Sequence, residues 1–119
     1  MNLSFILDHK LIISAAAGIF SILYATFLSY KVLSHPRGDK KMNDIADAIA
    51  EGAAAYMKRQ YTVIAIIGAI IFAILYFVFN PITAAGFAIG AIFSTIAGVI
   101  GMSIAVRSNI RTAQAAKKG

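Results

Sequence analysis

Two long stretches of the chain carry no Asp, Glu, Lys, Arg or His, and nearly all of their residues are apolar. They are Leu11–Tyr30, with 20 residues, and Tyr61–Val106, with 46. A helix needs about 20 apolar residues to cross a bilayer, so the pattern predicts one crossing in the first stretch and two in the second. Asn80-Pro81 divides the second stretch, because proline removes a backbone donor and disfavours a helical residue before it. The predicted spans are residues 11–33, 61–79 and 84–106, with a turn of about four residues between the last two.

The segment between the first two spans has a different pattern. From Met42 onward, apolar side chains recur at helical spacing, at Ile45, Ala46, Ile49, Ala53, Tyr56 and Met57. Asp39 can cap this helix, and no proline interrupts the chain from Lys40 to Phe79. The predicted fold class is therefore all-α: a polytopic membrane protein of three transmembrane helices, with a cytoplasmic amphipathic helix that extends the second span. The alternative places this amphipathic stretch on the membrane surface.

Small residues recur along the third span at intervals of three and four residues. They form one stripe, which consists of Gly86, Gly90, Ser94, Gly98, Gly101 and Ala105. In lipid, such a stripe lets helix backbones approach closely, so we interpret it as a helix-packing face. An ion pathway along the glycines is the functional alternative.

Composition and charge agree with a membrane protein. Hydrophobic residues make up 60% of the 119 residues and charged residues 13%, whereas soluble domains carry about 25% charged residues. This excludes a soluble enzyme, a nucleic-acid-binding domain and a disordered chain. Of the 11 Lys and Arg residues, nine fall in the loop after the first span or in the tail after the third, and a tenth, Lys31, lies at the end of the first span next to the loop. The positive-inside rule then predicts a cytoplasmic loop (34–60), a cytoplasmic tail (107–119) and an outside N-terminus, in a prokaryotic inner membrane.

No catalytic or metal-binding constellation is recognisable. Proton relays need Asp, Glu, Lys, Arg or His at membrane depth, and the two uncharged stretches contain none of these residues. The chain also has no cysteine, which excludes thiolate chemistry and sulfur-ligated metals. Asp44, Asp47 and Glu51 are spaced so that they could touch one ion, but a solvated acidic helix face is the preferred interpretation.

Two stretches, Met42–Tyr61 and Gly98–Ala116, say more about the protein family than the composition does. On them the chain resembles the N-terminal part of the membrane-bound, ion-translocating inorganic pyrophosphatases. The residues that carry this resemblance as a structural motif include Glu51, Gly52, Tyr56, Arg59, Gln60, Tyr61, Gly101, Met102, Asn109, Arg111 and Thr112.

The resemblance implies a homodimeric pump that hydrolyses Mg²⁺-bound pyrophosphate at the cytoplasmic face and moves H⁺ or Na⁺ outward. Family subunits are several times longer, and their pyrophosphate-binding motifs lie outside the matching region. We therefore expect residues 1–119 to be an N-terminal outer-ring scaffold segment that is inactive alone and binds no Mg²⁺ itself. We also expect a truncation or gene fragment, whose partners are the bilayer, the remaining pump helices and a second subunit.

Within this hypothesis, Glu51, Tyr56, Arg59 and Gln60 dock against cytoplasmic helix extensions of the rest of the pump. Arg107, Asn109 and Arg111 hold the inner end of the third span. Snorkelling of these side chains to the membrane interface is the alternative. A different class of function also fits three spans and a basic tail, namely a stand-alone, non-enzymatic, holin-like membrane protein.

Overall fold

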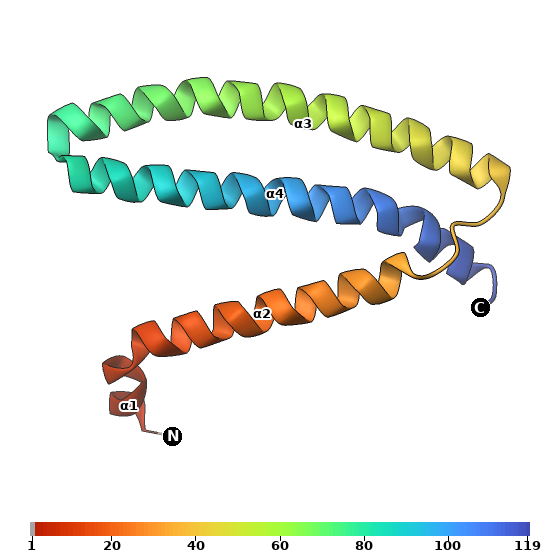
Figure 1. Cartoon of the computed structure of the whole chain (residues 1–119), viewed down its shortest axis with the longest axis horizontal. Helices are drawn as coiled ribbons and strands as arrows, with labels where there is room; N and C mark the ends of the chain where they lie inside the picture. Colours follow the sequence, from red (N-terminus) through yellow and green to blue (C-terminus); the bar gives the residue numbers. More distant parts are fainter. Residues whose placement is uncertain (1) are drawn as a thin grey trace. The chain divides into compact units, whose positions relative to one another are not determined.

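The computed structural model describes residues 2–119 and consists of helices joined by short connections (Figure 1). The helices are α1 (Leu3–Asp8), α2 (Lys10–Leu33), α3 (Lys40–Ile74), the π-helical turn η1 (Leu75–Phe79) and α4 (Pro81–Ala116). No strand occurs within residues 2–119, which confirms the all-α prediction. The chain divides into two compact units, one ending at Pro36 and the other running from Arg37 to Gly119.

The first unit consists of α1 and α2. The sequence pattern did not predict α1, a short helix before the first uncharged stretch. In α2, the hydroxyls of Ser21, Thr26 and Ser29 donate hydrogen bonds of 2.7–2.8 Å to carbonyls four residues earlier in the helix. These polar groups are therefore satisfied within α2 itself, as a lipid environment requires.

The second unit is a long antiparallel hairpin in which α3 and η1 run along α4 (Figure 1). Its first helix begins at a cap, because the Asp39 carboxylate accepts a hydrogen bond of 2.9 Å from the backbone N–H of Met42. This confirms the predicted role of Asp39. Helical structure then continues without a break from Lys40 to Phe79, so the amphipathic segment and the second apolar stretch form one rod.

The hairpin turns over a single non-helical residue, Asn80, where a turn of about four residues had been expected. The backbone of Asn80 is extended, and its N–H donates to the carbonyl of Leu75 at the end of the π turn, at 3.1 Å. Its side chain accepts a hydrogen bond of 2.8 Å from the backbone N–H of Thr83. Proline is well suited to the first position of a helix, where no backbone donor is needed. The third helix therefore starts at Pro81, immediately after the Asn80 cap.

Three helical segments are long and apolar enough to cross a membrane: Lys10–Leu33, Lys40–Phe79 and Pro81–Ala116. Their most apolar windows have mean hydropathies of 2.1, 2.8 and 2.1. Large apolar side chains are exposed along all three segments. Apolar surface of this extent marks a chain that is covered by lipid or by other protein. The chain is an integral membrane protein.

The contact between α3 and α4 is made by small and apolar side chains. Ala46 of α3 and Ile110 of α4 are buried and line the same groove between the two helices, and Ala84 near the start of α4 is buried as well. Of the predicted packing stripe, only Gly98 lies against α3, where it contacts Tyr61. The other five members are exposed in this structure: Gly86, Gly90, Ser94, Gly101 and Ala105. A helix turns by about 100° per residue, and this row is offset by about a quarter turn from the row that meets α3.

Candidate interaction site at the charged end of the hairpin

The antiparallel hairpin brings the two motif stretches together, although many residues separate them in sequence. One groove is lined by Ile45 and Ile49 from the first stretch and by Val106 and Asn109 from the second, together with Met42, Ala46, Ile110 and Ala113. Further along, Tyr61 at the end of the first stretch meets Gly98 at the start of the second. The sequence did not reveal this pairing, because periodicity shows which residues share a face but not which helix lies against it.

The contact between Tyr61 and Gly98 explains why glycine stands at residue 98. A Cβ atom there would overlap the tyrosine hydroxyl in its present position. The ring of Tyr61 therefore packs directly on the backbone of α4. Both residues lie in stretches that resemble the pyrophosphatase pattern, and together they determine how closely the helices approach.

A compact corner closes the charged end of the hairpin. Gly38 has a φ of +95°, and a Cβ atom at this residue would lie 2.8 Å from the Met42 Sδ and 2.9 Å from the Gln114 Oε1. The Asn43 amide donates to the carbonyl of Gly38 at 3.2 Å. The ammonium of Lys117, near the end of the chain, lies 3.4 Å from the Asp39 carboxylate. The corner therefore joins the start of α3 to the end of α4, and the sequence did not predict its contacts with Gln114 and Lys117.

Two groups in this corner have unusual electrostatics. The Met42 N–H, and less strongly the Lys117 ammonium, lower the pKa of Asp39 below its ordinary value, although partial desolvation opposes them. Gln114 has a side-chain Oε1 that is shielded from solvent and accepts no hydrogen bond within residues 2–119. In the sequence, the one signal for this turn was the glycine at residue 38, because glycine adopts positive φ more readily than other residues.

The three acidic residues of α3 do not form a metal site. Asp47 is engaged by the guanidinium of Arg37, with an N–O distance of 2.9 Å. Nowhere in the described part of the chain do three His, Cys, Asp or Glu side chains lie close enough to hold a metal ion. Asp44, Asp47 and Glu51 therefore do not assemble the set of oxygen donors that Mg²⁺ requires.

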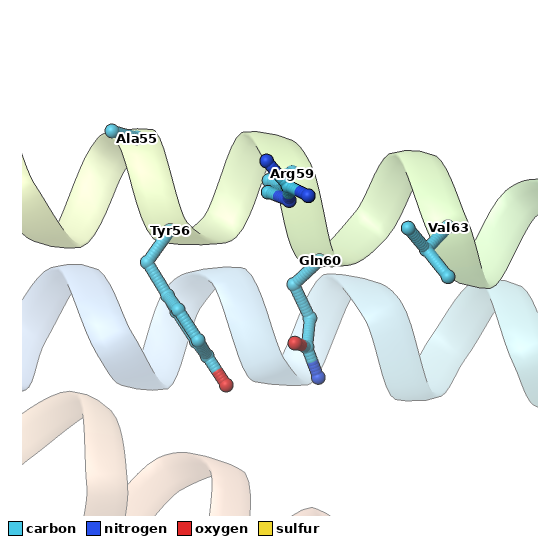
Figure 2. Close-up of a pocket in the computed structure, with 5 residues that line it drawn as sticks. All are labelled: Ala55, Tyr56, Arg59, Gln60 and Val63. Carbon is cyan, nitrogen blue, oxygen red and sulfur yellow. The ribbon is translucent and has the colours of Figure 1, made fainter.

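A shallow hollow on α3 is lined by motif residues. It is formed by Tyr56, Arg59 and Gln60 with Ala55 and Val63, all from this one helix. Figure 2 shows the side chains of Tyr56 and Gln60 pointing to the same side of α3. No hydrogen bond or ion pair to another residue among 2–119 engages the guanidinium of Arg59. These side chains are available for contact with groups beyond this hairpin.

Most of the other motif residues are also on the surface. Tyr61, Met102 and Arg111 are half-buried, whereas the exposed ones are Glu51, Gly52, Gly101, Asn109 and Thr112. Arg111 donates to the carbonyl of Arg107 within α4. The structure therefore brings the two motif stretches side by side but leaves most of their polar side chains facing outward.

Comparison with known proteins gives consistent matches. The family model described as inorganic H+ pyrophosphatase matches residues 19–119. A K(+)-insensitive pyrophosphate-energized proton pump of Methanosarcina mazei is 48% identical over 114 residues, which cover 93% of this chain and 17% of that protein. A putative K(+)-stimulated pyrophosphate-energized sodium pump of Clostridium tetani is 36% identical, with coverage of 93% of this chain and 16% of the relative.

A third relative, the K(+)-insensitive pyrophosphate-energized proton pump 2 of Moorella thermoacetica, is 41% identical over 86% of this chain and 15% of its own length. The chain thus spans about a sixth of the length of these curated relatives. No solved structure gives a significant match.

Proposed function

This chain belongs to the family of inorganic H+ pyrophosphatases, and from that membership we propose that it is the N-terminal scaffold segment of a pump that couples pyrophosphate hydrolysis to H⁺ or Na⁺ translocation. The observation that carries the proposal is the family match over residues 19–119, combined with relatives whose names describe pyrophosphate-energized pumps. These comparisons do not favour the stand-alone, holin-like alternative.

A scaffold role fits the chemistry of the helices. The stretch Tyr61–Val106 contains no Asp, Glu, Lys, Arg or His, the residues that usually bind or relay a proton at membrane depth. Pyrophosphate is a highly charged anion that needs several cations around it, and the acidic residues of α3 do not assemble a metal site. We propose that Mg²⁺ and pyrophosphate bind in the remainder of the pump. The segment contributes a rigid hairpin in the outer ring of helices, in a homodimer.

The proposed orientation follows from the basic residues. The connection and amphipathic part, residues 34–60, and the tail, residues 107–119, carry nine of the 11 Lys and Arg residues, and Lys31 at the end of the first span lies next to them. We propose that both are cytoplasmic, that the N-terminus is outside, and that the membrane-embedded parts fall within 11–33, 61–79 and 84–106. The tip of the hairpin at Asn80 then lies at the outer face.

Contacts with the remainder of the pump are proposed for the exposed motif residues. Glu51, Tyr56, Arg59 and Gln60 would meet cytoplasmic helix extensions of the remaining part. Arg107, Asn109 and Arg111 would anchor the cytoplasmic end of α4. Exposure of most of these side chains in the isolated hairpin supports this proposal. The exposed stripe from Gly86 to Ala105 is proposed as a packing face for another pump helix.

A chimeric pump tests the proposal. The aligned segment of the Methanosarcina mazei pump, 114 residues that are 48% identical, is replaced by this chain, and pyrophosphate hydrolysis and cation uptake are measured in inverted membrane vesicles. We expect the chimera to hydrolyse pyrophosphate and move the cation. The pump without its segment, and this chain alone, should do neither. An inactive chimera that is correctly inserted, or hydrolysis by this chain alone, would contradict the proposal.

A further inference from the structure

Uncharged motif residues gather on one flank of the hairpin, toward its charged end. On α3 the row consists of Ile45, Ile49, Tyr56 and Gln60, which recur at helical spacing. On α4 a similar row contains Gly101, Asn109 and Thr112. Each row is offset in the same rotational direction from the residues that join the two helices, and in an antiparallel pair this places both rows on the same side. We call this surface the neutral flank.

Direct contacts support this placement. Ile45 and Ile49 line one groove together with Asn109 of α4. Tyr56 and Gln60 line the hollow on α3 and point to the same side (Figure 2). The acidic residues Asp44, Asp47 and Glu51 occupy the other side of α3, by the same helical geometry. The neutral flank therefore combines residues from both motif stretches, whereas the opposite side of α3 is charged.

The apolar side chains of the neutral flank are exposed in this structure. Exposed fractions are 55% for Ile45, 49% for Ile49 and 57% for Tyr56. In a soluble helix, residues of this kind at this spacing face a partner. On this hairpin, α4 covers only one edge of the row.

Lipid cannot cover Ile45 and Ile49, because these two residues lie too far along the helix. The uncharged part of α3, Tyr61–Phe79, provides about 28 Å of helix, which by itself fills a hydrocarbon core of about 30 Å. Along the same rod, Ile49 lies about 18 Å beyond Tyr61 and Ile45 about 24 Å beyond it. The headgroup region adds only about 6 Å on each side. At the usual tilt of about 20°, Ile49 still lies about 17 Å above Tyr61, whereas the remaining core and the headgroup region together extend only about 9 Å above it.

We propose that the neutral flank is the docking face for a cytoplasmic helix from the remainder of the same pump subunit, which contacts it through apolar and small uncharged side chains. This inference rests on the proposed function and specifies its contact face. The chain spans only 15–17% of its relatives, so most of the pump is available to supply such a helix. A partner on the same polypeptide is also present at high effective concentration. Glu51 lies on the acidic side, so its proposed contact with the remainder of the pump is made with a different segment.

Site-directed photo-crosslinking in the chimeric pump tests the proposal. A benzophenone amino acid replaces Ile49 or Tyr56 on the neutral flank. The matched controls carry it at Asp44, at the depth of Ile45, or at Lys58, at the depth of Tyr56. We expect crosslinked peptides from the remainder of the pump at Ile49 and Tyr56, identified by mass spectrometry, and little or no such product at the controls.

Each other outcome overturns part of the argument. Crosslinks to the remainder from Asp44 or Lys58, and not from Ile49 or Tyr56, would refute the neutral flank while leaving the proposed function intact. A crosslink between two copies of residue 49 or 56 would assign the face to a second subunit. Crosslinks to lipid alone would refute the depth argument. Loss of pyrophosphate hydrolysis in the parent chimera would instead count against the proposed function.

A substitution provides an independent measurement. Ile49→Asp places a carboxylate in the proposed contact, and Ala48→Asp places one on an exposed neighbouring position outside it. We expect the first to lower the fraction of assembled, active chimera by roughly tenfold or more, because burying an unpaired carboxylate costs more than the free energy of a tenfold change. The second should leave this fraction nearly unchanged. Equal effects of the two substitutions would refute the proposal.

Discussion

The contact between Tyr61 and Gly98 makes a quantitative prediction about the hairpin. In Gly98→Ala the new methyl group would overlap the tyrosine hydroxyl, so the ring must move or the helices must separate. Overpacking of this kind costs about 1–3 kcal/mol. Alanine also favours a helix over glycine by up to about 1 kcal/mol, which acts in the opposite direction. We expect a net loss of roughly 1–2 kcal/mol in the free energy of hairpin unfolding.

Gly90→Ala is the matched control. Residue 90 lies in the same helix, and nothing stands within 4 Å of the position that its Cβ would take. This variant keeps the gain in helix propensity but has no clash, so it should be neutral or stabilising by up to about 1 kcal/mol. The difference between the two variants measures the clash alone.

Tyr61→Phe supplies a rescue. Without the hydroxyl, the nearest tyrosine atom to a Cβ at residue 98 is the ring carbon Cζ, at 3.4 Å, which is close but not an overlap. The double variant should therefore recover most of the lost stability, with a coupling free energy of about 1 kcal/mol or more. Unfolding is followed by titration with SDS in detergent micelles, using fluorescence transfer between labels at introduced cysteines, since the chain has none. If Gly98→Ala behaves like Gly90→Ala, or Tyr61→Phe gives no rescue, the packing argument is wrong.

Three further predictions concern the ends of the hairpin. Asn80→Ala removes the cap of α4 and should cost about 1 kcal/mol in the SDS titration, whereas Asn80→Asp should cost less; equal losses would contradict the capping role. Gly38→Ala forces a side chain into a left-handed conformation against Met42 and should cost about 1–3 kcal/mol, whereas Gly52→Ala, with open space around it, should not. The lowered pKa of Asp39 means that its capping interaction is fully present above pH 3.8 and is lost as the pH falls through the lower folded value. The Met42 amide proton, followed by NMR in micelles, should titrate with a midpoint below 3.8, and a midpoint at or above that value would refute the assignment.

Local signals along the chain predicted the helices well. The lengths of the uncharged stretches identified the membrane-spanning helices, and Asp39 marked the start of α3. The absence of proline correctly predicted one helix from Lys40 to Phe79. These features depend on the residues within one helix and its first turn. The turn was less well predicted, because Pro81 acts as the first residue of a helix rather than as a spacer.

Features that depend on two helices were not predictable in the same way. The stripe of small residues marks one face of α4, but α3 packs on a neighbouring face that includes Ile110 and Ala113. Either face offers side chains small enough for close approach, so composition alone cannot choose between them. The corner of Gly38 and Gln114 likewise joins residues from opposite ends of the hairpin. Such contacts follow from the register of the two helices, which no periodicity within one helix determines.

That register changes how the charge boundaries are interpreted. In sequence, charged residues resume just outside each uncharged stretch, at Arg59 before the second helix enters the membrane and at Arg107 after the third. In the hairpin, however, Tyr61 lies opposite Gly98, so the uncharged residues Val99–Val106 run alongside the charged part of α3 for about 12 Å. With helix axes about 9 Å apart, only a tilt above about 50° would bring Arg59 and Arg107 to one level, beyond the usual range for membrane helices. The uncharged end of α4 therefore needs cover from protein rather than from lipid, on the same side of the membrane and at the same depth as the motif residues Tyr56 and Gln60.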